Sequence, residues 1–158
     1  MTKQQGFSLV ELVMVMILIG ILAAVAIPRL GSLSAYSLAS ATADLVEALR
    51  YAQQQSMSHS GAAHFRVSIS GTGFSVQQGG ANVTSPLTGN AYTEDASVWS
   101  GVTSAVGTIT FDSRGRPTCG GFAACTLPTD NNLTITLQKN GESSSVMLER
   151  YTGYARAL

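Results

Sequence analysis

Hydrophobic residues are concentrated near the start of this 158-residue chain. Between Phe7 and Ile27 the chain has 21 residues with a single charge, that of Glu11. A helix of this length spans roughly 31 Å, which matches the hydrocarbon core of a bilayer. Lys3 and the amino terminus precede the run, and Arg29 is the first charge after it. The pattern predicts a membrane-spanning helix with a cytoplasmic N-terminus and the remainder of the chain on the other side.

The helical pattern continues past this apolar run. Pro28 lacks an amide proton, so it kinks a helix or ends one. Beyond it, apolar and small residues recur at three- and four-residue spacing: Leu30, Leu33, Ser37, Leu38, Ala41, Leu45, Leu49 and Ala52. The charged residues fall mainly on the opposite face: Asp44, Glu47 and Arg50. We expect one long helix over about 7–58, with a transmembrane half at 7–28 and an amphipathic continuation at 29–60.

After the helix the pattern changes to alternation. Gly61 ends the helix, and Phe65, Val67 and Ile69 point to one face of a predicted strand at 63–70. The other strand candidates are 74–77, 98–102, 108–111, 133–138 and 146–150, with a loop at 79–90 and a possible return strand within 151–157. A long helix followed by antiparallel strands predicts an α+β fold, in which the helix packs on the sheet of a β-rich head at 61–158.

Glu11 is unusual because a carboxylate inside an apolar run costs a few kcal/mol on membrane-insertion scales. If the chain is cut between Gly6 and Phe7, the new amino group on Phe7 lies four residues before Glu11. The carboxylate of one subunit can then pair with that amine on a neighbour, which compensates the buried charge and sets the register between subunits. The alternative is an acid tolerated near the membrane edge.

The segment 6–11, Gly-Phe-Ser-Leu-Val-Glu, resembles the type IV prepilin motif. The resemblance implies that prepilin peptidase removes a leader at 1–6 by cutting after Gly6 and N-methylates Phe7. It also implies that Glu11 acts in assembly with other pilins, and that the chain is anchored in the bacterial inner membrane with a periplasmic head. Pro28 matches the proline that commonly ends the membrane segment of this family.

A different reading of the same region is an ordinary secretory signal. Ala24-Val25-Ala26 fits the small-residue pattern of a signal peptidase site, which would give a chain starting at Ile27. The apolar run is longer than the usual 7–15 residues of such signals and has Glu11 inside it. Both features favour the prepilin interpretation.

Three further segments resemble minor pilins and pseudopilins of the GspH/FimT kind: 45–55, 109–117 and 146–153. The resemblance implies a structural subunit, not an enzyme, in a type IV pilus or in the pseudopilus of a type II secretion system. The alternative function is a binding module displayed by the pilus, either an adhesin or a DNA receptor.

Two cysteines, Cys119 and Cys125, stand six positions apart in a predicted Gly-rich loop. Two cysteines do not complete a four-ligand zinc site. A small disulfide-closed loop is the preferred interpretation and needs an oxidising compartment such as the periplasm, whereas two free thiols are the alternative.

Composition and motifs argue against catalysis and against a broad nucleic-acid interface. Lys plus Arg and Asp plus Glu each number 9, so the formal net charge is zero and no whole-domain basic field exists. His59 and His64 have no spacing that suggests a catalytic pair or a metal site, and we expect no cofactor. DNA contact would require several arginines to converge, and the candidates are Arg114, Arg116, Arg150 and Arg156.

Overall fold

The computed structural model describes residues 8–26, 33–59, 64–94, 96–122 and 132–158. The chain divides into two units, with the boundary between Leu33 and Ser34. The predicted leader and Pro28 lie outside the described residues. The predicted divisions after positions 6, 28 and 60 therefore stay predictions.

The first unit contains helix α1, Leu9–Ala26. Ser8 precedes it, and its carbonyl oxygen accepts the backbone N–H groups of Glu11 at 3.0 Å and Leu12 at 3.2 Å. Every side chain from Ser8 to Val25 is exposed in the single chain. Among the described residues, no helix combines the length and hydropathy of a candidate membrane span. The predicted apolar run, 7–27, extends past the described part of α1 at both ends.

The second unit contains helix α2, Leu33–Ser58, and two antiparallel sheets. One sheet has the order β3-β2-β1-β5-β6, with β1 at Phe65–Ser70, β2 at Gly73–Gln78, β3 at Ala81–Asn82, β5 at Gly107–Phe111 and β6 at Pro117–Gly120. The other has the order β4-β7-β8-β9, with β4 at Thr103–Ser104, β7 at Leu133–Lys139, β8 at Glu142–Leu148 and β9 at Ala155–Ala157.

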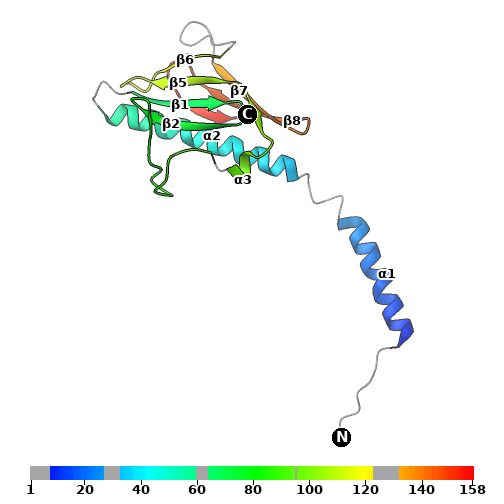
Figure 1. Cartoon of the computed structure of the whole chain (residues 1–158). Coiled ribbons are helices and arrows are strands. Elements are labelled where there is room, and N and C mark those ends of the chain that lie inside the picture. The colour runs from blue at the N-terminus through cyan, green and yellow to red at the C-terminus, as the bar shows by residue number, and fades with distance from the viewer. Residues whose placement is uncertain (1–7, 27–32, 60–63, 95, 123–131) are drawn as a thin grey trace. The chain divides into compact units, whose positions relative to one another are not determined.

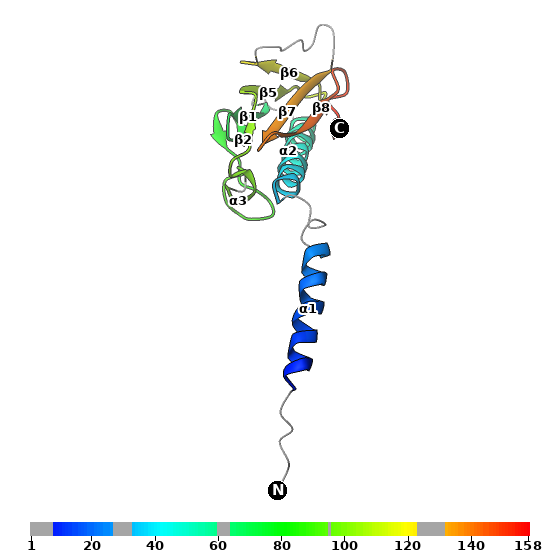
Figure 2. The ribbon, with the colours of Figure 1, turned by 90° about the vertical axis from the view of Figure 1, so that its right-hand side faces the viewer.

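Helix α2 lies beside both sheets (Figures 1 and 2), and a single hydrophobic core joins the three parts. Its fully buried members come from all three parts: Leu45 and Leu49 of α2, Val67 and Ile109 of the first sheet, and Ile135 and Val146 of the second. The predicted apolar stripe of the helix is confirmed at Leu38, Ala41 and Ala52, which are also buried. The α+β fold with a helix on antiparallel sheets is confirmed.

Polar side chains at the end of α2 tie the helix to two turns. The Nε of Arg50 donates to the carbonyl oxygen of Ala155 at 3.0 Å, and its Nη2 donates to the hydroxyl of Tyr154 at 3.0 Å. The amide of Gln53 donates to the carbonyl oxygen of Gly115 at 3.1 Å and also to that of Thr152. These contacts hold the β5–β6 turn and the β8–β9 turn against the same helix.

One predicted strand is wrong. The strand predicted at 98–102 is instead helix α3, Ala96–Trp99, followed by a turn in which the N–H of Val102 donates to the carbonyl oxygen of Trp99 at 2.9 Å. Gly101 has φ +74°, which suits that turn and not a strand. Trp99 and Val102, at the two ends of that turn, are both buried.

The predicted loops also contain short strands. Cys119 was expected in a Gly-rich loop, but β6 includes it and pairs with β5, so that Cys119 lies opposite Ile109. The loop predicted at 79–90 contains β3, which pairs with the end of β2. Both β3 and β6 are edge strands of the first sheet. Neither has an alternating apolar pattern of its own, so each depends on pairing with the neighbouring strand.

Candidate assembly and binding sites

The assembly candidate is the start of α1. Ser8 occupies the N-cap position and Glu11 the third helical position, which is the Ser-x-x-Glu spacing of a capping box. Glu11 lies in the first turn with an exposed side chain, so its carboxylate is available to another subunit. Negative charge in the first turn also complements the helix dipole. The predicted cleavage site, Gly6 and Phe7, lies outside the described residues.

Of the two cysteines in the predicted disulfide, the structure describes only Cys119. Cys119 is disulfide-bonded. Cys125, its predicted partner, lies outside the described residues, so the Cys119–Cys125 pairing stays a prediction.

Two of the four candidate arginines come together. Arg116 and Arg150 line the same recess, between the β5–β6 turn and the residues that follow β8. Arg116 forms an ion pair with Asp112 at 3.3 Å. The guanidinium of Arg150 lies 4.3 Å from the ring centroid of Tyr151. Its Nε is buried and has no hydrogen-bond partner within the described ranges.

The same turn places a negative charge in this basic recess. Burial alone would raise the pKa of Asp112, but the backbone N–H groups of Arg116 and Arg114 and the Arg116 guanidinium lower that pKa below its ordinary value. Asp112 is therefore ionised and offsets one arginine. Of the remaining candidates, neither Arg114 nor Arg156 lines this recess, and Arg156 lies in β9 opposite Met147.

The two histidines lie at the end of α2 and just before β1. The Nδ1 of His59 lies 3.0 Å from the carbonyl oxygen of Gln55 at the end of α2, and its ring lies 5.3 Å from that of Phe65. His64 is exposed just before β1. Within the described part of the chain, no group of three or more acidic, histidine or cysteine side chains is placed to bind a metal.

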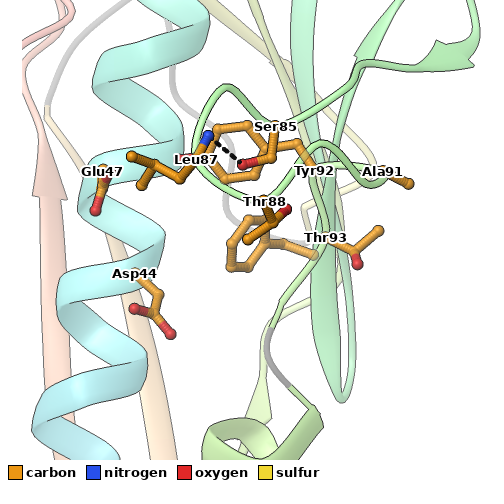
Figure 3. Close-up of a pocket in the computed structure, with 9 residues that line it drawn as sticks. Asp44, Glu47, Ser85, Leu87, Thr88, Ala91, Tyr92 and Thr93 are labelled. Atoms are coloured by element: carbon orange, nitrogen blue, oxygen red, sulfur yellow. Dashed lines mark hydrogen bonds between the residues drawn. The ribbon is translucent and has the colours of Figure 1, made fainter.

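A second recess, of about 160 Å³, lies between α2 and the segment 83–93, and we call it the α2–loop recess. Asp44 and Glu47 line it from the helix, and Leu87 and Tyr92 line it from the loop (Figure 3). Asp44 and Glu47 are three residues apart, so both reach the same side of α2.

Backbone hydrogen bonds fix the loop wall of this recess. The N–H of Val76 in β2 donates to the carbonyl oxygen of Tyr92 at 2.9 Å. The N–H of Tyr92 donates to Val83 at 2.7 Å, and that of Ser85 donates to Asn90 at 2.7 Å. The recess is therefore already shaped in the free chain.

Two aromatic side chains, those of Phe74 and Tyr92, line the recess, and the carboxylates of Glu47 and Asp44 act on Tyr92. The ring of Tyr92 lies 5.1 Å from that of Tyr51 and 6.4 Å from that of Phe74, centroid to centroid. Burial, and then the nearby charges of Glu47, Tyr51 and Asp44, raise the pKa of Tyr92 to about 12. Sequence reasoning missed this site because it placed Asp44 and Glu47 only on the polar face of a helix. The loop that faces them is brought there by long-range pairing.

Comparison with known families agrees with these features. The prokaryotic N-terminal methylation motif matches residues 1–27, which include α1 and Glu11. The family described as type II transport protein GspH matches residues 41–149, more than half of the chain. No match was found among curated proteins or among solved structures.

The fold and the N-terminal motif define the class as type IV pilin-like proteins, whose subunits are anchored in the inner membrane and assemble with other pilins. Within that class, the chain belongs to the GspH family of minor pseudopilins. Proteins of this class are structural subunits of type IV pili or of type II secretion systems.

Proposed function

We propose that the chain is a minor subunit that is cut after Gly6, N-methylated at Phe7 and built into a pilus or pseudopilus through Glu11. The observation that carries the proposal is Glu11 itself, an exposed carboxylate in the first turn of an otherwise apolar helix. In a filament whose core consists of such helices, this charge needs a partner, and the amino group of Phe7 on a neighbour supplies one.

The proposed topology follows from the same segment. The N-terminus lies in the cytoplasm, α1 lies in the inner membrane before assembly, and the head lies in the periplasm. The disulfide at Cys119 supports this location, because disulfides persist in oxidising compartments. Processing is tested by top-down mass spectrometry of the protein from its host membranes. A chain that begins at methylated Phe7 agrees with the proposal, whereas one that begins at Ile27 contradicts it.

The role of Glu11 has to be separated from its place in the capping box. Glutamine at this position still reaches back to the N-cap N–H, but it has no charge. We expect Glu11→Gln and Glu11→Ala both to insert in the membrane and to enter filaments about tenfold less or worse, because a neighbour's amine is left unpaired. Glu149→Gln removes one head carboxylate and serves as the control. Normal incorporation of Glu11→Gln would falsify the pairing role.

A deletion strain distinguishes a type IV pilus from a type II secretion system as the assembly that contains this subunit. Loss of surface pili with normal protein secretion places the subunit in a type IV pilus. Loss of secretion with normal pili places it in a type II secretion pseudopilus.

A second candidate function, DNA capture by a displayed head, is favoured by one observation. Arg116 and Arg150 share a recess, and the Nε of Arg150 is buried there without a partner among the described residues. The full chain in detergent should then bind duplex DNA with an affinity that falls steeply with salt. Arg150→Gln should weaken binding, whereas Lys139→Gln should leave it unchanged. Absence of binding at low salt removes this candidate.

A further inference from the structure

We propose that the α2–loop recess binds one lysine or arginine side chain of a neighbouring subunit in the filament. The proposal rests on the assembly function above and adds a specific contact between heads. It follows from the size of the recess, from its combination of aromatic and acidic walls, and from its place on the head.

The recess is the size of a side chain. Its volume of about 160 Å³ is well below the roughly 300–1,000 Å³ of pockets that enclose small-molecule ligands. Leu87 lines it and is 80% exposed, so it offers an apolar surface to the aliphatic stem of an entering residue. Lysine and arginine have such stems below their charged groups.

The lining chemistry matches a cationic end group. Glu47 is exposed and forms no ion pair with any described residue. The side chains of Phe74 and Tyr92 also line the recess, and an aromatic ring attracts an ammonium or guanidinium group placed over its face. Ser85 also lines the recess and is only 7% exposed. Its oxygen accepts the N–H of Leu87 at 3.3 Å and has a second lone pair that a cation can use.

A metal ion fits this recess less well. Calcium takes six to eight oxygen ligands. Among the described residues, the lining has two carboxylates, those of Asp44 and Glu47, and otherwise hydroxyl and apolar side chains. The described acidic, histidine and cysteine side chains form no group of three or more that could hold a metal ion. An organic cation on an aliphatic chain uses the carboxylates and the apolar walls together.

The arrangement of charge on the head points to a subunit as the source of this cation. The same unit has a basic recess at Arg116 and Arg150, which is distinct from the acidic recess at Asp44 and Glu47. Subunits of a helical filament contact one another head to tail, so the acidic recess of one head faces a different surface of its neighbour. In a chain with only 11% charged residues, two acids beside aromatic side chains form a directional contact for a basic neighbour.

Photo-crosslinking in assembled filaments tests the proposal. The full chain carries p-benzoyl-L-phenylalanine in place of Leu87, or of Thr88 as a second position, and filaments are isolated before irradiation. We expect a crosslink to a segment of another pilin or pseudopilin that contains lysine or arginine, identified by mass spectrometry. Adding Glu47→Gln should lower the yield about three- to tenfold. Adding Glu149→Gln, which removes one carboxylate elsewhere on the head, should not.

Each other outcome overturns the proposal in a distinguishable way. Filaments that contain the chain but show no crosslink, or a crosslink that Glu47→Gln does not change, overturn the recess contact and leave the assembly function intact. A crosslink only to a protein that is not a filament subunit also overturns the recess contact and leaves the assembly function intact. Absence of the chain from filaments, in the unlabelled protein as well, overturns both proposals.

Discussion

Gly153, in the β8–β9 turn, lies against Gly115 of the β5–β6 turn. Its φ is +70°, and a Cβ placed on it would come within 2.2 Å of the carbonyl oxygen of Gly115. We expect Gly153→Ala to lower the free energy of unfolding by about 2–4 kcal/mol, from the cost of positive φ together with the overlap. Chemical denaturation followed by the fluorescence of Trp99, the single tryptophan and a buried one, measures this loss.

The matched control is Gly89→Ala. Gly89 has the same φ of +70°, but a Cβ there would meet nothing within 4 Å. Its substitution should therefore cost only the backbone term, about 1–2 kcal/mol. Equal losses at the two glycines would show that the close approach of the two turns contributes nothing.

Tyr92 reports on the charge of the α2–loop recess. Burial and then Glu47 raise its pKa to about 12, so it should stay protonated where an ordinary tyrosine, of pKa 10.0, ionises. Because the unfolded chain loses this proton first, the stability that Tyr92 contributes should be fully present below pH 10.0 and decrease as the pH rises from there towards about 12.

The corresponding variant is Glu47→Gln. It should lower the pKa of Tyr92 towards its ordinary value without reaching it, because burial is the larger cause and remains. NMR titration of the Tyr92 ring carbon that bears the hydroxyl measures the pKa directly, and Glu149→Gln is the control. An unchanged pKa in Glu47→Gln would mean that this carboxylate does not act on the recess.

At the scale of the secondary-structure elements, strand β9 is held by a side chain of α2, that of Arg50. Arg50 donates to Ala155 and to Tyr154, and its guanidinium lies 4.9 Å from the ring centroid of Tyr154. Lysine cannot make both hydrogen bonds with one planar group. We expect Arg50→Lys to cost about 1–2 kcal/mol and to speed hydrogen exchange at the amides of Glu149 and Leu158, which bond across β8 and β9.

The control for this prediction lies on the same strand. Arg156→Lys alters an exposed arginine of β9 and should leave exchange unchanged. Amides of β1, in the other sheet, should also exchange at the wild-type rate in Arg50→Lys. A uniform increase across both sheets would indicate global destabilisation and would contradict a local role for Arg50.

Elements with their own hydrophobic period were predictable from the sequence. Alternation places Phe65, Val67 and Ile69 on one face of β1, and all three are buried. β6 was missed because, among its residues, only Pro117 is buried, so the strand depends on pairing with β5. α3 was predicted as a strand because four residues are too few to reveal a helical period.

The same reasoning explains which sites were found. The assembly site is local: Ser8, Glu11 and the apolar run are contiguous, so their spacing alone identifies the motif. The two recesses each combine segments that are far apart in the chain. Asp44 and Tyr92 line one recess, and Arg116 and Arg150 line the other. Each pair is brought together only when the sheets form, so no periodic pattern in the sequence predicts it.

At the scale of the whole molecule, the buried core and the proposed Glu11 contact belong to different units. The buried core runs from Leu38 to Ala155 and takes no residue from α1, whose described side chains are exposed through Val25. The head should therefore fold without the anchor, and the anchor should be free to serve contacts between subunits.

A truncated chain that starts at Arg29 tests this separation. Because no described core contact is lost, we expect its denaturation midpoint to match that of the full chain in detergent to within about 0.5 kcal/mol. Trp99 fluorescence and near-ultraviolet circular dichroism measure the folded state in both. The same truncated chain should be absent from filaments. Full-length Glu11→Gln should have a head of normal stability and should also be depleted from filaments. A truncated head that unfolds at lower denaturant would mean that α1 or the segment after it stabilises the head, and the two roles would then be coupled.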